Sequence, residues 1–225
     1  GKLGEKKINF SMYNNCKKIK THAFAYDDFI KMNNKNDEAK LKLTKSKYIV
    51  YIDEDVPNHS DPFYHGFDKK LCDPIIFYNE LNRYFDYIEK KTGYKIIIAA
   101  YPKSNYEKNN PFNRQILYNK TIELIKDSQF VLQHNSTAVN YSIIFKKPII
   151  FLNSKNYSLH YNLSIKHLAD ELDLLPINLS NPKKWDIHES VNNKIFDKYF
   201  INYISDNFKN RNLTSSEIIY EEIFK

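Results

Sequence analysis

Short apolar runs alternate with amphipathic stretches along most of the chain from residue 48 onward. Runs rich in β-branched and aromatic residues predict strands at 48–52, 94–100, 130–133, 149–152 and 177–179. Apolar residues at helical spacing predict helices at 74–92, 116–125, 137–145, 165–174, 189–204 and 215–224. Alternation of this kind is typical of βαβ units around a mostly parallel sheet. We therefore expect an α/β fold, a three-layer Rossmann-like domain.

The helix after the first strand has the clearest boundaries. Asp73 can accept the unpaired amide hydrogens of the helix start, and Pro74 suits the first turn. Gly93 can adopt the left-handed conformation that ends a helix. Phe77 and Leu81 begin an apolar stripe between these two ends, so this stretch is predicted to pack one face against the sheet.

The chain is expected to divide at residue 48. Residues 1–47 mix short apolar pieces with a polar segment and are interpreted as a connector, whereas residues 48–225 form the Rossmann-like, nucleotide-sugar-binding domain. The first residue is Gly, so we expect that the sequence continues upstream. Of the 225 residues, 42% are apolar, 27% are charged and only four are glycine, which excludes collagen, low-complexity disorder and a glycine-turned all-β chain.

Charge and cysteine content narrow the class of partner. The formal net charge is +7, which suits nucleic acid, an anionic membrane surface or a phosphorylated ligand, but the lysines form no long run and a solvated surface explains them more simply. Two cysteines without CxxC spacing exclude a disulfide framework and a cysteine-rich zinc module. No apolar run approaches the roughly 20 residues of a membrane span. A reducing, cytoplasmic location is therefore expected.

Ligands of open parallel α/β sheets bind at the carboxyl ends of the strands. The residues that directly follow each predicted strand are therefore the candidates for a binding site. The third run is followed by His134, Asn135, Ser136 and Thr137. A serine or threonine here can cap the next helix, and the first amides of that helix can hold a phosphate or a sugar hydroxyl. The alternative is that Ser136 is only a cap and His134 packs at the strand end.

The turn after the second run is the second candidate. Tyr101, Pro102, Lys103 and Ser104 follow that run, and the lysine can act as a point charge for phosphate oxygens while the serine donates a hydrogen bond. A plain surface turn is the alternative, because proline and serine are common turn residues.

Carboxylates and a histidine follow the first run. Asp53, Glu54 and His59 can remove a proton from an acceptor hydroxyl if the fold brings them to a cleft. The same cluster can bind a divalent cation through oxygen, or be a solvated acidic loop.

Several other chemistries lack their signatures. The chain contains no GxGxxG, no Walker A motif, no HExxH and no GxSxG. A zinc finger and an RNP-like aromatic motif are also missing, so nucleic acid is not an expected partner.

Three segments together, residues 48–61, 96–104 and 130–152, resemble the C-terminal half of bacterial surface-polysaccharide proteins with GT-B glycosyltransferase architecture. The likeness extends from residue 23 to about residue 153. In such enzymes this half holds the nucleotide-sugar donor in the loops after its strands. By position, Tyr101 stands where several GT-B enzymes have a histidine near the donor phosphate, and the turn after the third run stands where Ser or Thr holds a phosphate.

The resemblance implies a transferase that passes a sugar from a nucleotide-sugar to capsule, O-antigen or a similar glycan. The implied partners are the nucleotide-sugar, a glycan or lipid-linked acceptor and the anionic inner face of the plasma membrane. The implied reaction uses no cofactor and requires no metal ion. Only 47 residues precede the first strand, whereas complete GT-B enzymes carry an N-terminal domain that typically binds the acceptor. The alternatives are a noncatalytic glycan-assembly module, a sugar-nucleotide epimerase-like enzyme and a polyol-phosphate transferase.

Overall fold

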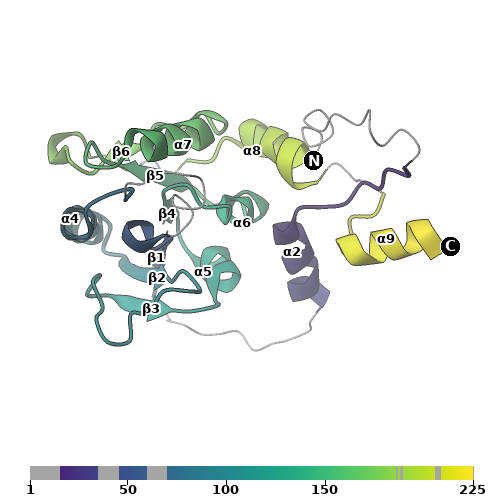
Figure 1. Cartoon of the computed structure of the whole chain (residues 1–225), viewed down its shortest axis with the longest axis horizontal. Helices are drawn as coiled ribbons and strands as arrows, with labels where there is room; N and C mark the ends of the chain where they lie inside the picture. The colour runs from purple at the N-terminus through teal and green to yellow at the C-terminus, as the bar shows by residue number, and fades with distance from the viewer. Residues whose placement is uncertain are drawn as a thin grey trace.

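The computed structural model describes residues 16–34, 46–59, 70–185, 187, 190–205 and 209–224. Six strands form one sheet with helices on both sides (Figure 1). The predicted three-layer α/β, Rossmann-like fold is confirmed. Much of the stretch interpreted as a connector lies outside the described residues, as do Ser60, Asp61 and His188.

All six strands are parallel, and their order across the sheet is β3-β2-β1-β4-β5-β6. The strands are β1 (Tyr48–Ile52), β2 (Lys95–Ala99), β3 (Gln115–Leu117), β4 (Val131–Gln133), β5 (Ile149–Asn153) and β6 (Ile177–Asn178). Every residue of β1 is buried, as expected for a central strand covered on both faces. The chain leaves β1 toward β2 and leaves β4 toward β5, so the direction of winding reverses between β1 and β4.

The helix after β1 forms as its sequence predicts. α4 (Pro74–Thr92) begins at Asp73, whose carboxylate accepts a hydrogen bond of 3.0 Å from the amide of Ile76. It ends at Gly93, which has a φ of 73°. This positive φ suits glycine because a side chain there is strained. The helix therefore has a fixed start at the carboxyl edge of the sheet.

Helices cover the two faces of the sheet. α4 lies on one face, and α5 (Thr121–Asp127) and α6 (Val139–Ile144) lie on the other (Figure 1). α7 (Leu159–Asp170) packs against β5, and short 3₁₀ turns occur at η2 (Val56–Asn58) and η3 (Pro182–Lys184). The faces of the sheet are filled by buried aliphatic and aromatic side chains, including Tyr51, Phe85 and Leu132.

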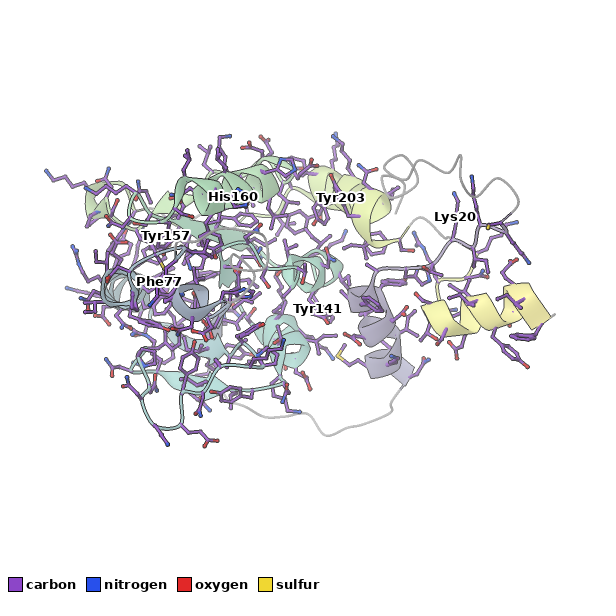
Figure 2. All side chains as sticks on the ribbon, in the orientation of Figure 1. Lys20, Phe77, Tyr141, Tyr157, His160 and Tyr203 are labelled. Atoms are coloured by element: carbon purple, nitrogen blue, oxygen red, sulfur yellow. The ribbon has the colours of Figure 1, made fainter. Side chains whose placement is uncertain are left out.

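Further helices lie on the outer side of α6. α2 (Phe24–Asn34), α8 (Asn193–Tyr199) and the π-helical turn η4 (Phe200–Ile204) pack against α6, and α9 (Ser215–Phe224) is joined at its start to α2. Tyr141 of α6 points toward α2 (Figure 2), and its hydroxyl donates to the carboxylate of Asp28 at 2.6 Å. The described part of the connector is thus packed against the sheet domain through α6.

The ends of the described chain are tied to each other by polar contacts. His22 Nδ1 and the Ser205 hydroxyl are 2.7 Å apart, and the amide of Ser215 donates to Asp27 at 2.9 Å. α9 lies beside α2 as a result (Figure 1). Within the described ranges, no helix has the length and apolar content that crossing a membrane requires.

Some predicted boundaries are wrong. The predicted helix 116–125 is in fact β3 followed by α5, because Ile116 and Leu117 pair with β2. The predicted helix 165–174 begins earlier, at Leu159, and ends at Asp170. Of the predicted helix 189–204, the described part contains α8 and then the π-helical turn η4.

Candidate functional site

The turns after β1 and β4 meet where the winding of the sheet reverses. In doubly wound α/β folds this reversal leaves a crevice at the carboxyl ends of the two strands, and ligands bind there. Asp53 and Glu54 follow β1, and His134 and Asn135 follow β4. The structure therefore brings the predicted loops after β1 and β4 together.

Glu54 bridges the two turns. One carboxylate oxygen accepts a hydrogen bond of 2.9 Å from the amide of Asn135, and the other accepts one of 3.4 Å from the hydroxyl of Tyr161. Burial raises the pKa of Glu54 to about 7, although these hydrogen bonds act in the opposite direction. Glu54 as a residue is partly exposed, and a carboxyl with a pKa near 7 can exchange protons near neutral pH, as a general base must.

Asp53 is more deeply buried and is fully engaged. Its oxygens accept hydrogen bonds from the amide of Asp55 at 2.9 Å, the amide of Tyr101 at 3.2 Å and the hydroxyl of Tyr106 at 2.8 Å. Burial raises its pKa to about 6. These contacts join the loop after β1 to the loop after β2, so Asp53 positions both loops.

His134 has no exposed surface. Its Nδ1 lies 2.8 Å from the carbonyl oxygen of Leu152 and its Nε2 lies 3.1 Å from the hydroxyl of Tyr51. Burial lowers its pKa to about 4, so the ring is neutral at physiological pH. This position supports the alternative interpretation of His134 as a residue packed at the strand end.

The turn after β4 differs from its predicted form. The helix begins at Val139 with Ala138 at the cap position, so the expectation that Ser136 or Thr137 caps it is wrong. The Ser136 hydroxyl instead accepts a hydrogen bond of 3.3 Å from the amide of Ala138, inside the turn. Ser136 is partly exposed and Thr137 is exposed, so both side chains can reach a ligand.

The loop after β2 contributes exposed cations at Lys103 and Lys108. Lys103 is exposed and forms no ion pair with any described residue, whereas the Ser104 hydroxyl donates to the carbonyl of Tyr101 at 2.7 Å and stabilises the turn. The rings of His59 and Tyr101 lie together, with centroids 5.2 Å apart. This loop therefore stands beside the loop after β1, as the pairing of β1 with β2 requires.

Two later residues hold the long connection from β2 to β3. Phe112 is fully buried and packs against Tyr51 and Tyr106. The Arg114 guanidinium donates to Asp86 at 2.6 Å and to Glu89 at 3.1 Å, both on α4. The loop that carries Lys103 is thus fixed to the domain at its far end.

Two functional contacts were missed by sequence reasoning. Tyr106 and Tyr161 donate to Asp53 and Glu54, yet they are 53 and 107 residues away from them in the chain. Eighteen tyrosines occur in the sequence, so residue type gives no signal that would single out these two. These tyrosines reach the two carboxylates because of the order of the strands in the sheet, which the sequence pattern does not give.

Comparison with protein families, curated proteins and solved structures found no match to this chain. Within the described residues, no three His, Cys, Asp or Glu side chains are close enough together to hold a metal ion. Function is therefore inferred from the geometry of the site and from the resemblance of its three loops.

Proposed function

We propose that this chain is the donor-binding domain of a glycosyltransferase that passes a sugar from a nucleotide-sugar to a bacterial surface glycan, such as capsule or O-antigen. The observation that supports it most directly is the position of Glu54 at the reversal between β1 and β4, where nucleotides bind in doubly wound folds. The three segments that resemble GT-B proteins contain β1, β2 and β4, which are neighbours in the sheet.

The donor phosphates would be held by the loops on either side of β1. Lys103 supplies a positive charge from the loop after β2, and Ser136 and Thr137 supply hydroxyl and main-chain donors from the turn after β4. Charge-assisted hydrogen bonds of this kind stabilise the negative charge that grows on a departing diphosphate. His134 takes no part because it is buried in the core.

Glu54 would act as the general base. It takes the proton of the acceptor hydroxyl while that oxygen bonds to the anomeric carbon of the donor sugar. The bond from the anomeric carbon to the phosphate oxygen breaks, and the nucleoside diphosphate leaves with the electron pair. The acceptor is a glycan or lipid-linked glycan, which would bring the protein to the inner face of the plasma membrane.

A thermal-shift screen against CMP, CDP, UDP and GDP tests the proposal. One nucleotide is expected to raise the melting temperature, and Lys103→Ala should remove most of that increase. Lys126→Ala, which changes an exposed lysine at the end of α5, is the matched control and should bind normally. If no nucleotide changes the melting temperature of the intact chain, the assignment of a nucleotide site is wrong.

A further inference from the structure

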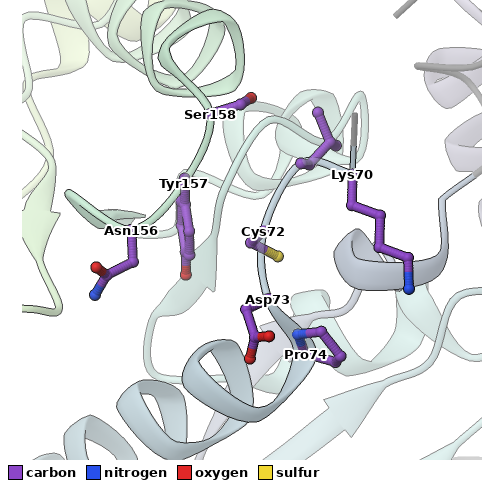
Figure 3. A pocket seen from close by; sticks show the side chains of 8 residues that line it. Lys70, Cys72, Asp73, Pro74, Asn156, Tyr157 and Ser158 are labelled. Atoms are coloured by element: carbon purple, nitrogen blue, oxygen red, sulfur yellow. The ribbon is translucent and has the colours of Figure 1, made fainter. Parts of the chain in front are cut away.

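A pocket lies beside the candidate site, between the loop after β5 and the start of α4. Its volume is about 490 Å³, and its lining includes Cys72, Asp73, Asn156, Tyr157 and Ser158 (Figure 3). Both segments lie at the carboxyl edge of the sheet, as do Glu54 and Asn135, because one follows β5 and the other begins the helix after β1. The pocket is therefore next to the proposed nucleotide site and separate from its loops.

Tyr157 is the unusual residue of this pocket. Only 5% of it is exposed, and its hydroxyl has no hydrogen-bond partner among the described residues. Its ring packs against Phe77 and His134, and Figure 3 shows its hydroxyl end pointing toward Cys72 and Asp73. A buried hydroxyl without a partner destabilises a fold, so such groups usually serve a ligand or a bound water.

Glu80 of α4 is buried and holds Asn156, a residue of the pocket lining. One of its carboxylate oxygens accepts a hydrogen bond of 2.7 Å from the side-chain amide of Asn156. Its other oxygen is buried and has no partner among the described residues. Two buried oxygens therefore lack partners among the described residues: the hydroxyl of Tyr157, which lines the pocket, and one carboxylate oxygen of Glu80, which holds Asn156 of the lining.

The electrostatics of the pocket select the class of ligand. Burial raises the pKa of Tyr157 well above its ordinary value and raises that of Cys72 to about 12, so both groups keep their protons. The lining carries one carboxylate, of Asp73, and one ammonium group, of Lys70, and Glu80 adds a second carboxylate bonded to Asn156, so the pocket has no excess of positive charge for a phosphate. A ligand hydroxyl, which both donates and accepts, satisfies a phenol and a carboxylate together.

We propose that this pocket binds a sugar ring, with Tyr157 and Asn156 hydrogen-bonded to its hydroxyl groups. The identification of the ligand as a sugar rests on the proposed function, whereas the need for a hydroxyl-bearing ligand follows from the unpaired oxygens. The bound ring is either the sugar of the donor or a sugar of the acceptor glycan.

Calorimetry on Tyr157→Phe, with three kinds of probe, tests the proposal. The probes are the nucleoside diphosphate that gives the largest thermal shift, nucleotide-sugars of that nucleotide, and methyl glycosides of the same sugars. We expect the variant to bind a sugar-bearing probe about tenfold more weakly and the nucleoside diphosphate unchanged. A loss confined to the nucleotide-sugar assigns the pocket to the donor, and a loss with the methyl glycoside assigns it to the acceptor.

The stability of the same variant gives a second readout. Removing an unpaired buried hydroxyl should raise the melting temperature by about 2 to 4 °C. Tyr48→Phe is the matched control, because the Tyr48 hydroxyl is buried but donates to the carbonyl of Leu124 at 3.0 Å. This control should melt at a lower temperature and keep full affinity for every probe.

Two results would overturn the proposal. One is wild-type affinity of Tyr157→Phe for all sugar-bearing probes, and the other is a fall in its melting temperature, which would show that the hydroxyl is paired within the fold. Binding of the nucleoside diphosphate is measured separately, so the sugar pocket can fail while the nucleotide site stands. If no nucleotide binds, methyl glycosides of common hexoses still test the pocket by themselves.

Discussion

The carboxylate of Glu54 accepts a hydrogen bond of 2.9 Å from the main-chain amide of Asn135. This bond joins the ends of β1 and β4, the two strands between which the sheet reverses its winding. A negative group of the protein therefore already occupies one of the main-chain donors in the turn that sequence analysis assigned to a phosphate. A bound diphosphate must use other donors, of which Ser136, Thr137 and Lys103 are accessible.

Glu54→Gln should change the pH dependence of stability. Burial raises the pKa of Glu54 from 4.5 to about 7 in the folded chain, so between these values the folded state binds more protons than the unfolded state. The stability that this group contributes is therefore present below pH 4.5 and is lost as the pH rises through 7. Glutamine has no such loss, so the variant should gain about 3 kcal/mol over the wild type between pH 4 and pH 8.

Urea denaturation at several pH values measures that difference. His134 also changes the stability in this range but is present in both proteins, whereas the charge of Asp53 raises the pKa of Glu54 and is therefore part of the measured difference. A difference between variant and wild type that is constant from pH 4 to pH 8 would show that Glu54 titrates normally in the fold.

Asp53 and Tyr106 should behave as one structural unit. The Tyr106 hydroxyl donates to the buried Asp53 carboxylate at 2.8 Å, so Tyr106→Phe should lower the free energy of unfolding by about 1 to 3 kcal/mol. Tyr220→Phe changes an exposed tyrosine and should alter it by less than about 0.5 kcal/mol. The losses in Tyr106→Phe and Asp53→Asn should add to more than the loss in the double variant. Strict additivity in urea denaturation would contradict this coupling.

His134 should stay neutral throughout the physiological range. Burial lowers its pKa from 6.5 to about 4, so its ring resonances should not move between pH 5.5 and pH 8 in an NMR titration. The signal is assigned by its loss in His134→Gln. A titration of this signal with a midpoint near 6.5 would mean that the ring is solvated and available to a ligand.

The turn after β4 should matter for binding more than for folding. Neither Ser136 nor Thr137 caps α6 with its side chain, and neither is buried. The double variant Ser136→Ala with Thr137→Ala should therefore melt within about 2 °C of the wild type. Its affinity for the nucleotide should fall by tenfold or more in calorimetry. Unaltered affinity of this folded variant would exclude the turn from the phosphate site.

The fold was predictable because its main signals are local. The five predicted runs contain all the strands except β3, and α4 is bounded by the capping residues Asp73 and Gly93. β3 was missed because Ile116 and Leu117 also fit the apolar stripe of a helix, and only pairing with β2 makes them a strand. A strand of three residues is too short for its alternation of apolar and polar positions to be told apart from the stripe of a helix.

The candidate site was only partly predictable, for a related reason. The ends of the predicted strands pointed to loops that the structure brings to one edge of the sheet, since parallel strands place their carboxyl ends there. Packing decides which side chains are accessible to a ligand. In the turn after β4, His134 is buried whereas Thr137 is exposed. The long-range partners Tyr106 and Tyr161 follow from the order of the strands, which the pattern along the chain does not contain.

Arg114 should be essential for fixing the loop that carries Lys103. Its guanidinium is largely buried and donates to Asp86, Glu89 and Asn82 of α4, and it lies over the ring of Phe85 at 5.1 Å.

Lysine cannot reproduce this planar set of contacts, so Arg114→Lys should lower the free energy of unfolding by about 2 to 4 kcal/mol. Arg83→Lys, at an exposed position of α4, is the matched control and should stay within about 0.5 kcal/mol of the wild type. In limited proteolysis, Arg114→Lys should be cut between residues 101 and 113 sooner than the wild type, because the loop has lost its anchor to α4. Equal rates of cleavage, together with a small loss of stability, would show that the other contacts of the loop, such as those of Phe112 and Tyr106, hold it in place without Arg114.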